Sequence, residues 1–167
     1  MIPARTSVLL VVALAAGACA RRPPHESTTS ESHPVGIMLE RKPCYGTCPV
    51  YSLTISGDGH VFFEGRQHVD SVGKFSAHID PDRLIALIRL FDEKQFFELD
   101  DRYVMGEKNC QPYATDAPTV ITSLTARGQT KRVEHDAGCV GVPARLGEIE
   151  RAIDQAAGVA RWIGRRG

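Results

Sequence analysis

The chain lacks an excess of charge of either sign, because its 20 Lys and Arg residues balance its 20 Asp and Glu residues. A neutral chain offers no basic field to a phosphate backbone, so we expect no nucleic-acid partner. The sequence also has no apolar run near the roughly 20 residues that a membrane-spanning helix needs. Its longest such run, Val8–Ala18, has eleven residues. We therefore expect neither a nucleic-acid-binding protein nor a protein that crosses a membrane by helices.

Local catalytic signatures are missing too. There is no G-x-S-x-G elbow, no H-E-x-x-H zinc motif, no phosphate-binding glycine loop and no dinucleotide fingerprint. We therefore expect a binding or structural module rather than an enzyme, with no bound cofactor.

The amino terminus is the most informative segment that is present. Arg5 gives it a positive charge, Val8–Ala18 is apolar, and small residues lead into Cys19. This order resembles a bacterial lipoprotein signal peptide of residues 1–18, after which Cys19 would carry the lipid, including palmitate. Two or more acyl chains on one residue hold a protein stably at a membrane. The alternative is an ordinary secretion signal in which Cys19 has no role.

The same resemblance implies a location. Lipoproteins retained in the inner membrane commonly have Asp after the lipidated cysteine, whereas Ala20 follows it here. We therefore expect a cell-envelope protein anchored in the outer membrane and facing the periplasm. Residues 19–34 are rich in Ser, Thr and Pro without apolar periodicity, which predicts a disordered tether after the lipidated cysteine. His25 and His33 within it are expected to be solvated rather than to bind a metal.

Residues 35–163 have the length of one domain, and residues 164–167 are expected to form a short tail. Alternating apolar residues and turn dipeptides such as Asp58-Gly59 predict strands in this domain. The expected strands are Gly36–Lys42, Val50–Ser56, His60–Gly65, Thr119–Ala126 and Thr130–His135.

Two segments have helical periodicity. Asp80 and Pro81 fit the start of the first helix, whose expected apolar stripe comprises Leu84, Ile85, Leu87, Ile88 and Phe91. Pro143 begins the second helix, which ends at Gly158 and whose stripe comprises Leu146, Ile149, Ile153 and Ala156. Trp162, beyond it, is expected to cap the core, with a ligand-stacking role as the alternative.

These elements predict an α+β fold: an antiparallel sheet from two β-hairpins plus a short N-terminal strand, with two helices packed on one face. The tripeptide Ser52-Leu53-Thr54 recurs as Ser123-Leu124-Thr125 at the same place in the second hairpin. This recurrence is consistent with a ββα repeat.

Four cysteines remain when Cys19 is set aside, namely Cys44, Cys48, Cys110 and Cys139. An even number in an exported domain predicts two disulfides, with three possible connectivities. We favour Cys44–Cys48, with Gly46 allowing a tight ring, and Cys110–Cys139.

Three other roles for the cysteines stay open. Cys44 and Cys48 could form a thiol-redox pair, although thioredoxin-like sites use two intervening residues rather than three. The pattern Cys-x-x-x-Cys-Pro is similar to that of copper-delivery proteins of cytochrome oxidase assembly, which implies copper bound by Cys44, Cys48 and His135. A four-cysteine zinc site is the third alternative, which the distant single cysteines disfavour.

The run Glu40-Arg41-Lys42-Pro43-Cys44-Tyr45-Gly46-Thr47-Cys48-Pro49-Val50-Tyr51 resembles the opening of a bacterial family known as domain of unknown function 6438. Further matches to its pattern are Gly57-Asp58-Gly59, Thr115-Asp116-Ala117-Pro118-Thr119, and His135 with Gly138-Cys139. The resemblance extends from about Ile37 to Trp162. It implies a lipoprotein or a secreted protein and implies no activity.

Four residues are candidates for contact with a ligand or partner. Tyr45 and Gly46 are expected at the tip of the small cystine loop, where partner contacts often lie, although Tyr45 could instead pack on the sheet. Asp116 and His135 could also converge, together with Asp136, beside Cys139, so that a carboxylate assists His135 as a general base. We favour the simpler interpretation, in which Asp116 caps a turn before Pro118 and His135 ends a strand.

An acidic run could attract Ca²⁺ but lacks the spacing of a known loop, so a solvated surface is expected; it comprises Asp92, Glu93, Glu98, Asp100 and Asp101. Taken together, the sequence predicts a lipid-anchored, disulfide-bonded binding or structural module whose partner is an unidentified envelope protein or ligand. The alternative is a copper-binding or thiol-redox protein.

Overall fold

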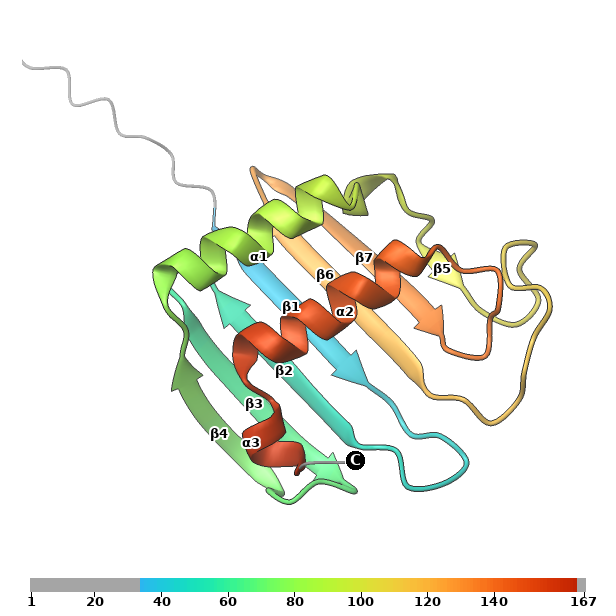
Figure 1. The fold of residues 1–167 in the computed structure, drawn as a ribbon, viewed down its shortest axis with the longest axis horizontal. Coiled ribbons are helices and arrows are strands. Elements are labelled where there is room, and N and C mark those ends of the chain that lie inside the picture. Colours follow the sequence, from blue (N-terminus) through green and yellow to red (C-terminus); the bar gives the residue numbers. More distant parts are fainter. Residues whose placement is uncertain (1–33, 165–167) are drawn as a thin grey trace, which may run out of the picture. The chain divides into compact units, whose positions relative to one another are not determined.

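One mixed sheet of seven strands forms the centre of the structure, a computed structural model that describes residues 34–164. The strands lie in the order β4-β3-β2-β1-β6-β7-β5 (Figure 1). Their bounds are β1 Gly36–Arg41, β2 Val50–Ser56, β3 His60–Gln67, β4 Gly73–His78, β5 Arg102–Tyr103, β6 Thr119–Ala126 and β7 Gln129–Asp136. The expected signal peptide, Cys19 and nearly all of the tether lie outside the described residues.

The two predicted hairpins flank the N-terminal strand. β1 pairs antiparallel with β2 on one side and with β6 on the other. Alternate residues face the helices, so Leu39 is fully buried between Leu53 of β2 and Thr122 of β6. Gly59, with φ +88°, forms the first hairpin turn in a conformation that L side chains rarely adopt. The predicted core of the sheet is therefore confirmed.

The sheet is larger than the two-hairpin prediction, because β4 and β5 join its edges. β4 has the exposure pattern of an edge strand, with no buried position, so it lacks the apolar alternation that marks a strand in a sequence. β5 has only two residues and pairs with β7 in parallel. The prediction of a wholly antiparallel sheet is therefore wrong at this edge.

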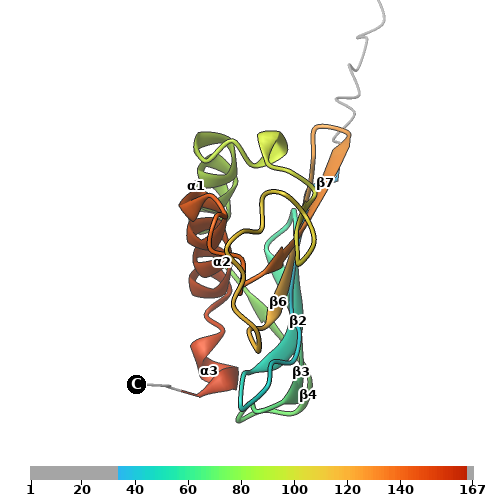
Figure 2. The ribbon, with the colours of Figure 1, turned by 90° about the vertical axis from the view of Figure 1, so that its right-hand side faces the viewer.

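Two long helices cover one face of the sheet (Figure 2). α1 spans Pro81–Glu93, and the carboxylate of Asp80 accepts a hydrogen bond from the N–H of Asp82 as its N-terminal cap. α2 spans Ala144–Ala157 and ends at Gly158, which has φ +65°. All four residues of the predicted α2 stripe are buried. In α1, however, Ile85 is 47 % exposed, because the buried stripe follows Leu84, Leu87 and Phe91 instead.

Two short helices complete the core. Phe96 in the 3-10 turn η1, Phe96–Glu98, packs edge-on against Phe91 of α1 with ring centres 4.9 Å apart. Trp162 lies in α3, Ala160–Ile163, and stacks on Phe63 of β3 at 4.6 Å. Trp162 is buried, so the prediction of a core-capping role is confirmed.

The ββα repeat is not realised in the topology. β2 and β6 run in the same direction, because both are antiparallel to β1. Their hairpin partners β3 and β7 nevertheless lie on opposite sides of them, while α1 and α2 lie on the same face (Figure 2). Superposing the β2–β3–α1 unit on the β6–β7–α2 unit would have to preserve the strand direction and the helix-covered face while exchanging left and right within the sheet. No rotation does this, so the two units are not related as structural repeats. Within residues 34–164, no helix has the length and apolar character to cross a membrane.

Candidate functional site

Three loops leave the sheet at one end and are joined to each other there (Figure 1). They are residues 42–49 between β1 and β2, residues 104–118 before β6, and residues 137–143 between β7 and α2. Backbone hydrogen bonds run from Ala114 N to Gly138 O at 2.8 Å and from Val140 N to Pro112 O at 3.0 Å. We call this region, defined by the three ranges, the loop end.

Two disulfides staple the loop end. Cys44–Cys48 closes a small ring within residues 42–49, with Cα atoms 5.8 Å apart. Cys110–Cys139 joins the other two loops, with Cα atoms 4.5 Å apart. Together they form the connectivity that the sequence favours among the three possible ones. Cys110 and Cys139 are buried, whereas Cys44 and Cys48 are only half-buried.

The tip of the small ring carries the most exposed large apolar side chain described. Tyr45 is 89 % exposed, so it does not pack on the sheet. Gly46 adopts φ +146°, and its N–H donates to Cys44 O at 3.0 Å. The N–H of Tyr45 donates to Asp116 O at 3.3 Å, which brings Asp116 beside the ring. Three of the four predicted contact residues therefore lie together, and the loop end also exposes Met105 and Val140.

His135 lies apart from that group. It is the penultimate residue of β7, and its Nδ1 is 2.8 Å from Oε1 of Glu150, a buried residue of α2. A carboxylate accepts, so Nδ1–H of His135 donates. The neighbouring Asp136 instead accepts from the hydroxyl of Tyr113 at 3.0 Å. The carboxylate beside His135 is that of Glu150 and not that of Asp116, and His135 lies at the end of its strand, as the favoured interpretation holds.

Sequence reasoning missed a polar cluster beneath α2. Arg41 is directly opposite Tyr51 at the last pair of β1 and β2, so both side chains point to the helix face. Asp154 of α2 lies over them. Nη2 of Arg41 donates to Oδ2 of Asp154 at 2.7 Å, and the hydroxyl of Tyr51 donates to Oδ1 at 2.7 Å. Nε of Arg41 donates to the Tyr51 hydroxyl at 2.9 Å and closes the triad.

Burial shapes the electrostatics of this triad. Burial raises the pKa of Asp154, against the opposing effects of Arg41 and the Tyr51 hydroxyl. Burial also raises the pKa of Tyr51, and the negative charge of Asp154 adds to that. For Arg41, burial disfavours the charged form, but Asp154 and Tyr51 outweigh it and the pKa is raised. The guanidinium is therefore fixed as a cation that holds two strands and one helix together.

A hollow of about 260 Å³ adjoins the triad and the small ring. It is lined by Arg41, Cys48, Pro49, Tyr51, Pro118, Asp154 and Ile163. Its walls are mainly apolar, and the triad supplies its polar groups. The pairing of Arg41 with Tyr51 could be predicted from the sequence once residues 42–49 were interpreted as a loop. The hydrogen bonds of Asp154 could not, because an acidic residue on a surface helix is normally expected to be solvated.

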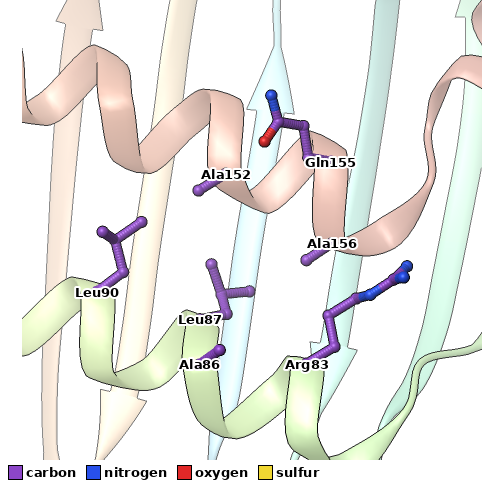
Figure 3. A pocket seen from close by; sticks show the side chains of 7 residues that line it. All are labelled: Arg83, Ala86, Leu87, Leu90, Ala152, Gln155 and Ala156. Carbon is purple, nitrogen blue, oxygen red and sulfur yellow. The ribbon is translucent and has the colours of Figure 1, made fainter.

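A second and larger hollow, of about 440 Å³, lies between the two long helices (Figure 3). Leu87 and Leu90 of α1 point toward α2 across the gap, where Ala152 and Ala156 have only small side chains. Ala86 of α1 completes the apolar lining. Arg83 and Gln155 are its polar residues. No residue of the loop end lines it, and it brings together no group with catalytic or metal-binding chemistry.

The alternative copper site of Cys44, Cys48 and His135 is not assembled in residues 34–164. The sulfur atoms of Cys44 and Cys48 are bonded to each other and are not thiolates, and His135 is held by Glu150. No group of three or more His, Cys, Asp or Glu residues is placed to hold a metal ion in this part of the chain. Within the acidic run, Asp92 pairs with Arg127 and Asp101 with Lys131, each at 2.5 Å.

These features define a disulfide-stapled, two-layer α+β domain whose conspicuous surface is the loop end. A family model described as "Domain of unknown function (DUF6438)" matches residues 35–157, and the chain belongs to this family. Comparison with curated proteins gave no match. The resemblance noted from the run Glu40 to Tyr51 is therefore confirmed, and that run contains the small ring together with two members of the triad.

Proposed function

We propose that this chain is a lipid-anchored protein of the bacterial cell envelope that acts as a non-enzymatic binding module through its loop end. The lipoprotein-type sequence at residues 1–19 supports the anchor, and Ala20 supports the outer membrane facing the periplasm. Two disulfides support an oxidising compartment. An unidentified envelope protein or ligand is the partner.

The exposure of Tyr45 carries the proposal. A side chain of this size that is 89 % exposed at a loop tip leaves apolar area unburied. Tyr is enriched in protein interfaces because it supplies a large rigid surface and a hydroxyl at low entropic cost. The ring is held by Cys44–Cys48 at its base and by Asp116 at its tip. A contact surface fixed in advance loses less entropy on binding.

The contact is tested by a photo-crosslinking amino acid placed at position 45 in cells that produce the full chain. We expect a discrete adduct from position 45 and none from the matched control position 85, an exposed apolar residue on α1. The adduct should disappear when Cys44 and Cys48 are replaced by Ser, since the ring then loses its fixed form. Equal crosslinking from positions 45 and 85 would contradict the assignment of the loop end.

The anchor is tested separately. Labelling with radioactive palmitate should mark the wild-type chain and leave the Cys19→Ser variant unmarked, and only the wild type should sediment with outer membranes. A labelled Cys19→Ser variant would rule out lipidation at that position. This result does not bear on the loop end, so the two parts of the proposal can fail independently.

A thiol-redox role of Cys44 and Cys48 is the second candidate, and their exposure favours it. They are half-buried, whereas Cys110 and Cys139 are almost inaccessible. Exposed disulfides are generally the labile ones. Titration against dithiol buffers with mass-spectrometric thiol mapping tests the role: a redox-active pair should have a potential near that of the compartment, and a structural pair one below about −300 mV.

A further inference from the structure

The β3–β4 hairpin carries two histidines that sequence reasoning did not connect. His60 begins β3 and His78 ends β4, and the two residues are directly opposite each other in the antiparallel register. Directly opposed residues point to the same face of a sheet. The ring centres are 5.1 Å apart, the ring planes are perpendicular, and both residues are exposed. This pair lies on the sheet face that α1 and α2 leave uncovered, since the neighbouring positions Val61 and Ala77 face the core.

Contacts of the hairpin fix the position of His78. Its Nε2 is 2.9 Å from the carbonyl oxygen of Asp58. A carbonyl only accepts, so Nε2 carries a hydrogen, and in the neutral imidazole it is Nδ1 that has the lone pair. A Cβ at Gly59 would come within 3.1 Å of the His78 ring, so the turn glycine makes room for it. A ring nitrogen that donates to a backbone carbonyl, with its other nitrogen unprotonated, is the usual arrangement of a metal-binding histidine.

His60 is also positioned. Its ring stacks on Phe62 with centres 6.3 Å apart and planes at 28°. Its Nε2 is 3.9 Å from Oδ2 of Asp58. The hydroxyl of Ser56 donates a hydrogen bond to Oδ1 of Asp58, so the side chain of Asp58 is held beside the pair. One acidic side chain therefore lies next to the two imidazoles.

We propose that His60 and His78 form a binding site for a divalent transition-metal ion of the class that prefers imidazole, such as Zn²⁺ or Cu²⁺. The distance supports this assignment. Two imidazoles that share a tetrahedral ion at a metal–nitrogen distance of about 2.1 Å have ring centres roughly 5 Å apart. The observed rings are at that separation. Water completes the coordination, because the hairpin supplies two protein nitrogen ligands and Asp58 contributes its charge.

This site is independent of the cysteines and of the loop end. It needs no thiolate, so the Cys44–Cys48 disulfide does not prevent it, and imidazole suits both ions in an oxidising space. It is an open site with two ligands, in keeping with the finding that no group of three metal-binding side chains is assembled among residues 34–164. An open position lets such an ion pass on to, or be shared with, another donor.

The test is a calorimetric titration of the full chain, purified in detergent, with Zn²⁺ alone at pH 7.5. We expect one ion bound per chain. Even second-shell partners contribute about 10–100-fold to metal affinity, so loss of one of two ligands should weaken binding at least about tenfold. His60→Ala and His78→Ala should each show this loss. His78 also makes a hydrogen bond to the carbonyl of Asp58 in the turn, so its replacement could disturb the hairpin. His60→Ala is therefore the decisive variant. Its melting temperature without metal checks that it is folded.

Matched controls separate this site from three of the other four histidines, the fourth being His135, whose Nδ1 is bonded to Glu150. His68→Ala removes another exposed histidine, which follows β3, and the double variant His25→Ala/His33→Ala removes the two near the amino terminus. All three substitutions should leave zinc affinity unchanged. The proposal is overturned if folded His60→Ala binds zinc as the wild type does, if a control variant loses the binding instead, or if the wild type binds no zinc.

Discussion

Removal of the two disulfides one at a time should affect stability unequally. The perturbations are Cys44→Ala/Cys48→Ala and Cys110→Ala/Cys139→Ala. A disulfide restricts the unfolded chain more strongly when it closes a longer loop. The two bonds differ greatly in this respect, with sequence separations of 4 and 29. The long closure should therefore contribute more to the free energy of unfolding.

Loop-closure entropy gives the magnitudes. A loop of about 30 residues corresponds to about 3.6 kcal/mol at 25 °C, and a loop of about five residues to about 2 kcal/mol. Burial acts in the same direction, because Cys110 and Cys139 are 1 % and 5 % exposed and their truncation also removes packing. The Cys110–Cys139 bond also ties residues 104–118 to residues 137–143 and so fixes the position of both loops. Its removal should cost at least about 1.5 kcal/mol more than removal of the small ring.

Urea denaturation followed by circular dichroism measures both variants against the wild type. In addition to the stability ranking, the unfolding slope should rise when Cys110–Cys139 is removed, because the unfolded chain then exposes more surface. The reasoning is refuted if loss of Cys44–Cys48 destabilises the domain as much as loss of Cys110–Cys139. With excess dithiothreitol present, the stability gap between each variant and the wild type should shrink, which assigns the effect to the bonds and not to the substitutions.

Three further predictions follow from packing and charge. Asp154→Ala leaves a half-buried guanidinium and a buried phenol without their acceptor. It should lower the free energy of unfolding, measured by urea denaturation, by about 2–4 kcal/mol, a value reduced from that of a fully buried ion pair because the triad is partly exposed. A loss below about 1 kcal/mol would show that the triad does not stabilise the fold. Leu87→Ala should cost about 2–5 kcal/mol and Ile85→Ala less than about 1 kcal/mol, since only the former is buried, and a reversed order would contradict the observed helix face. A hydrogen bond from Lys131 lowers the pKa of Asp101. The stability from this pair is therefore complete above the unfolded pKa of about 3.9 and is lost as the pH falls through the lower folded value. Lys131→Met should raise the pKa of Asp101 in an NMR titration, and an unchanged value would show that the pair does not form in solution.

The central strands could be predicted from the sequence because their periodicity is strong. The bounds of β2 and β6 coincide with the expected ranges, since each has buried side chains at alternate positions along the strand. β4 carries no buried position and β5 only two residues, so neither has a local pattern to detect. The exposed position of Ile85 could not be foreseen either, because several stripes fit α1 and only the packing against the sheet chooses between them.

The candidate site divides in the same way. The Cys44–Cys48 pair follows from short-range features, namely ring size and a glycine in the turn, and it leaves Cys110 and Cys139 as the second pair. The exposure of Tyr45 could not be predicted, because the sequence is equally consistent with packing on the sheet. The partners of His135 and Arg41 could not be predicted either, because Glu150 and Asp154 are more than 10 residues away and lie on a helix whose polar residues read as solvated. Long-range ion pairs depend on how α2 lies across the strands, which no local pattern encodes.

The triad holds together the two ends of the run from Glu40 to Tyr51. Arg41 and Tyr51 are the last paired residues of β1 and β2, so they are the two stems from which the small ring projects. Both stems bond to the same carboxylate of Asp154. One helix residue therefore fixes the base of the loop, the disulfide fixes its middle, and the carbonyl of Asp116 fixes its tip. Restraining the loop at its base, middle and tip costs conformational entropy during folding. It does so without bringing Tyr45 into the core. Under the proposed function, this fixing prepares the contact surface before its partner arrives, which lowers the entropy lost on binding.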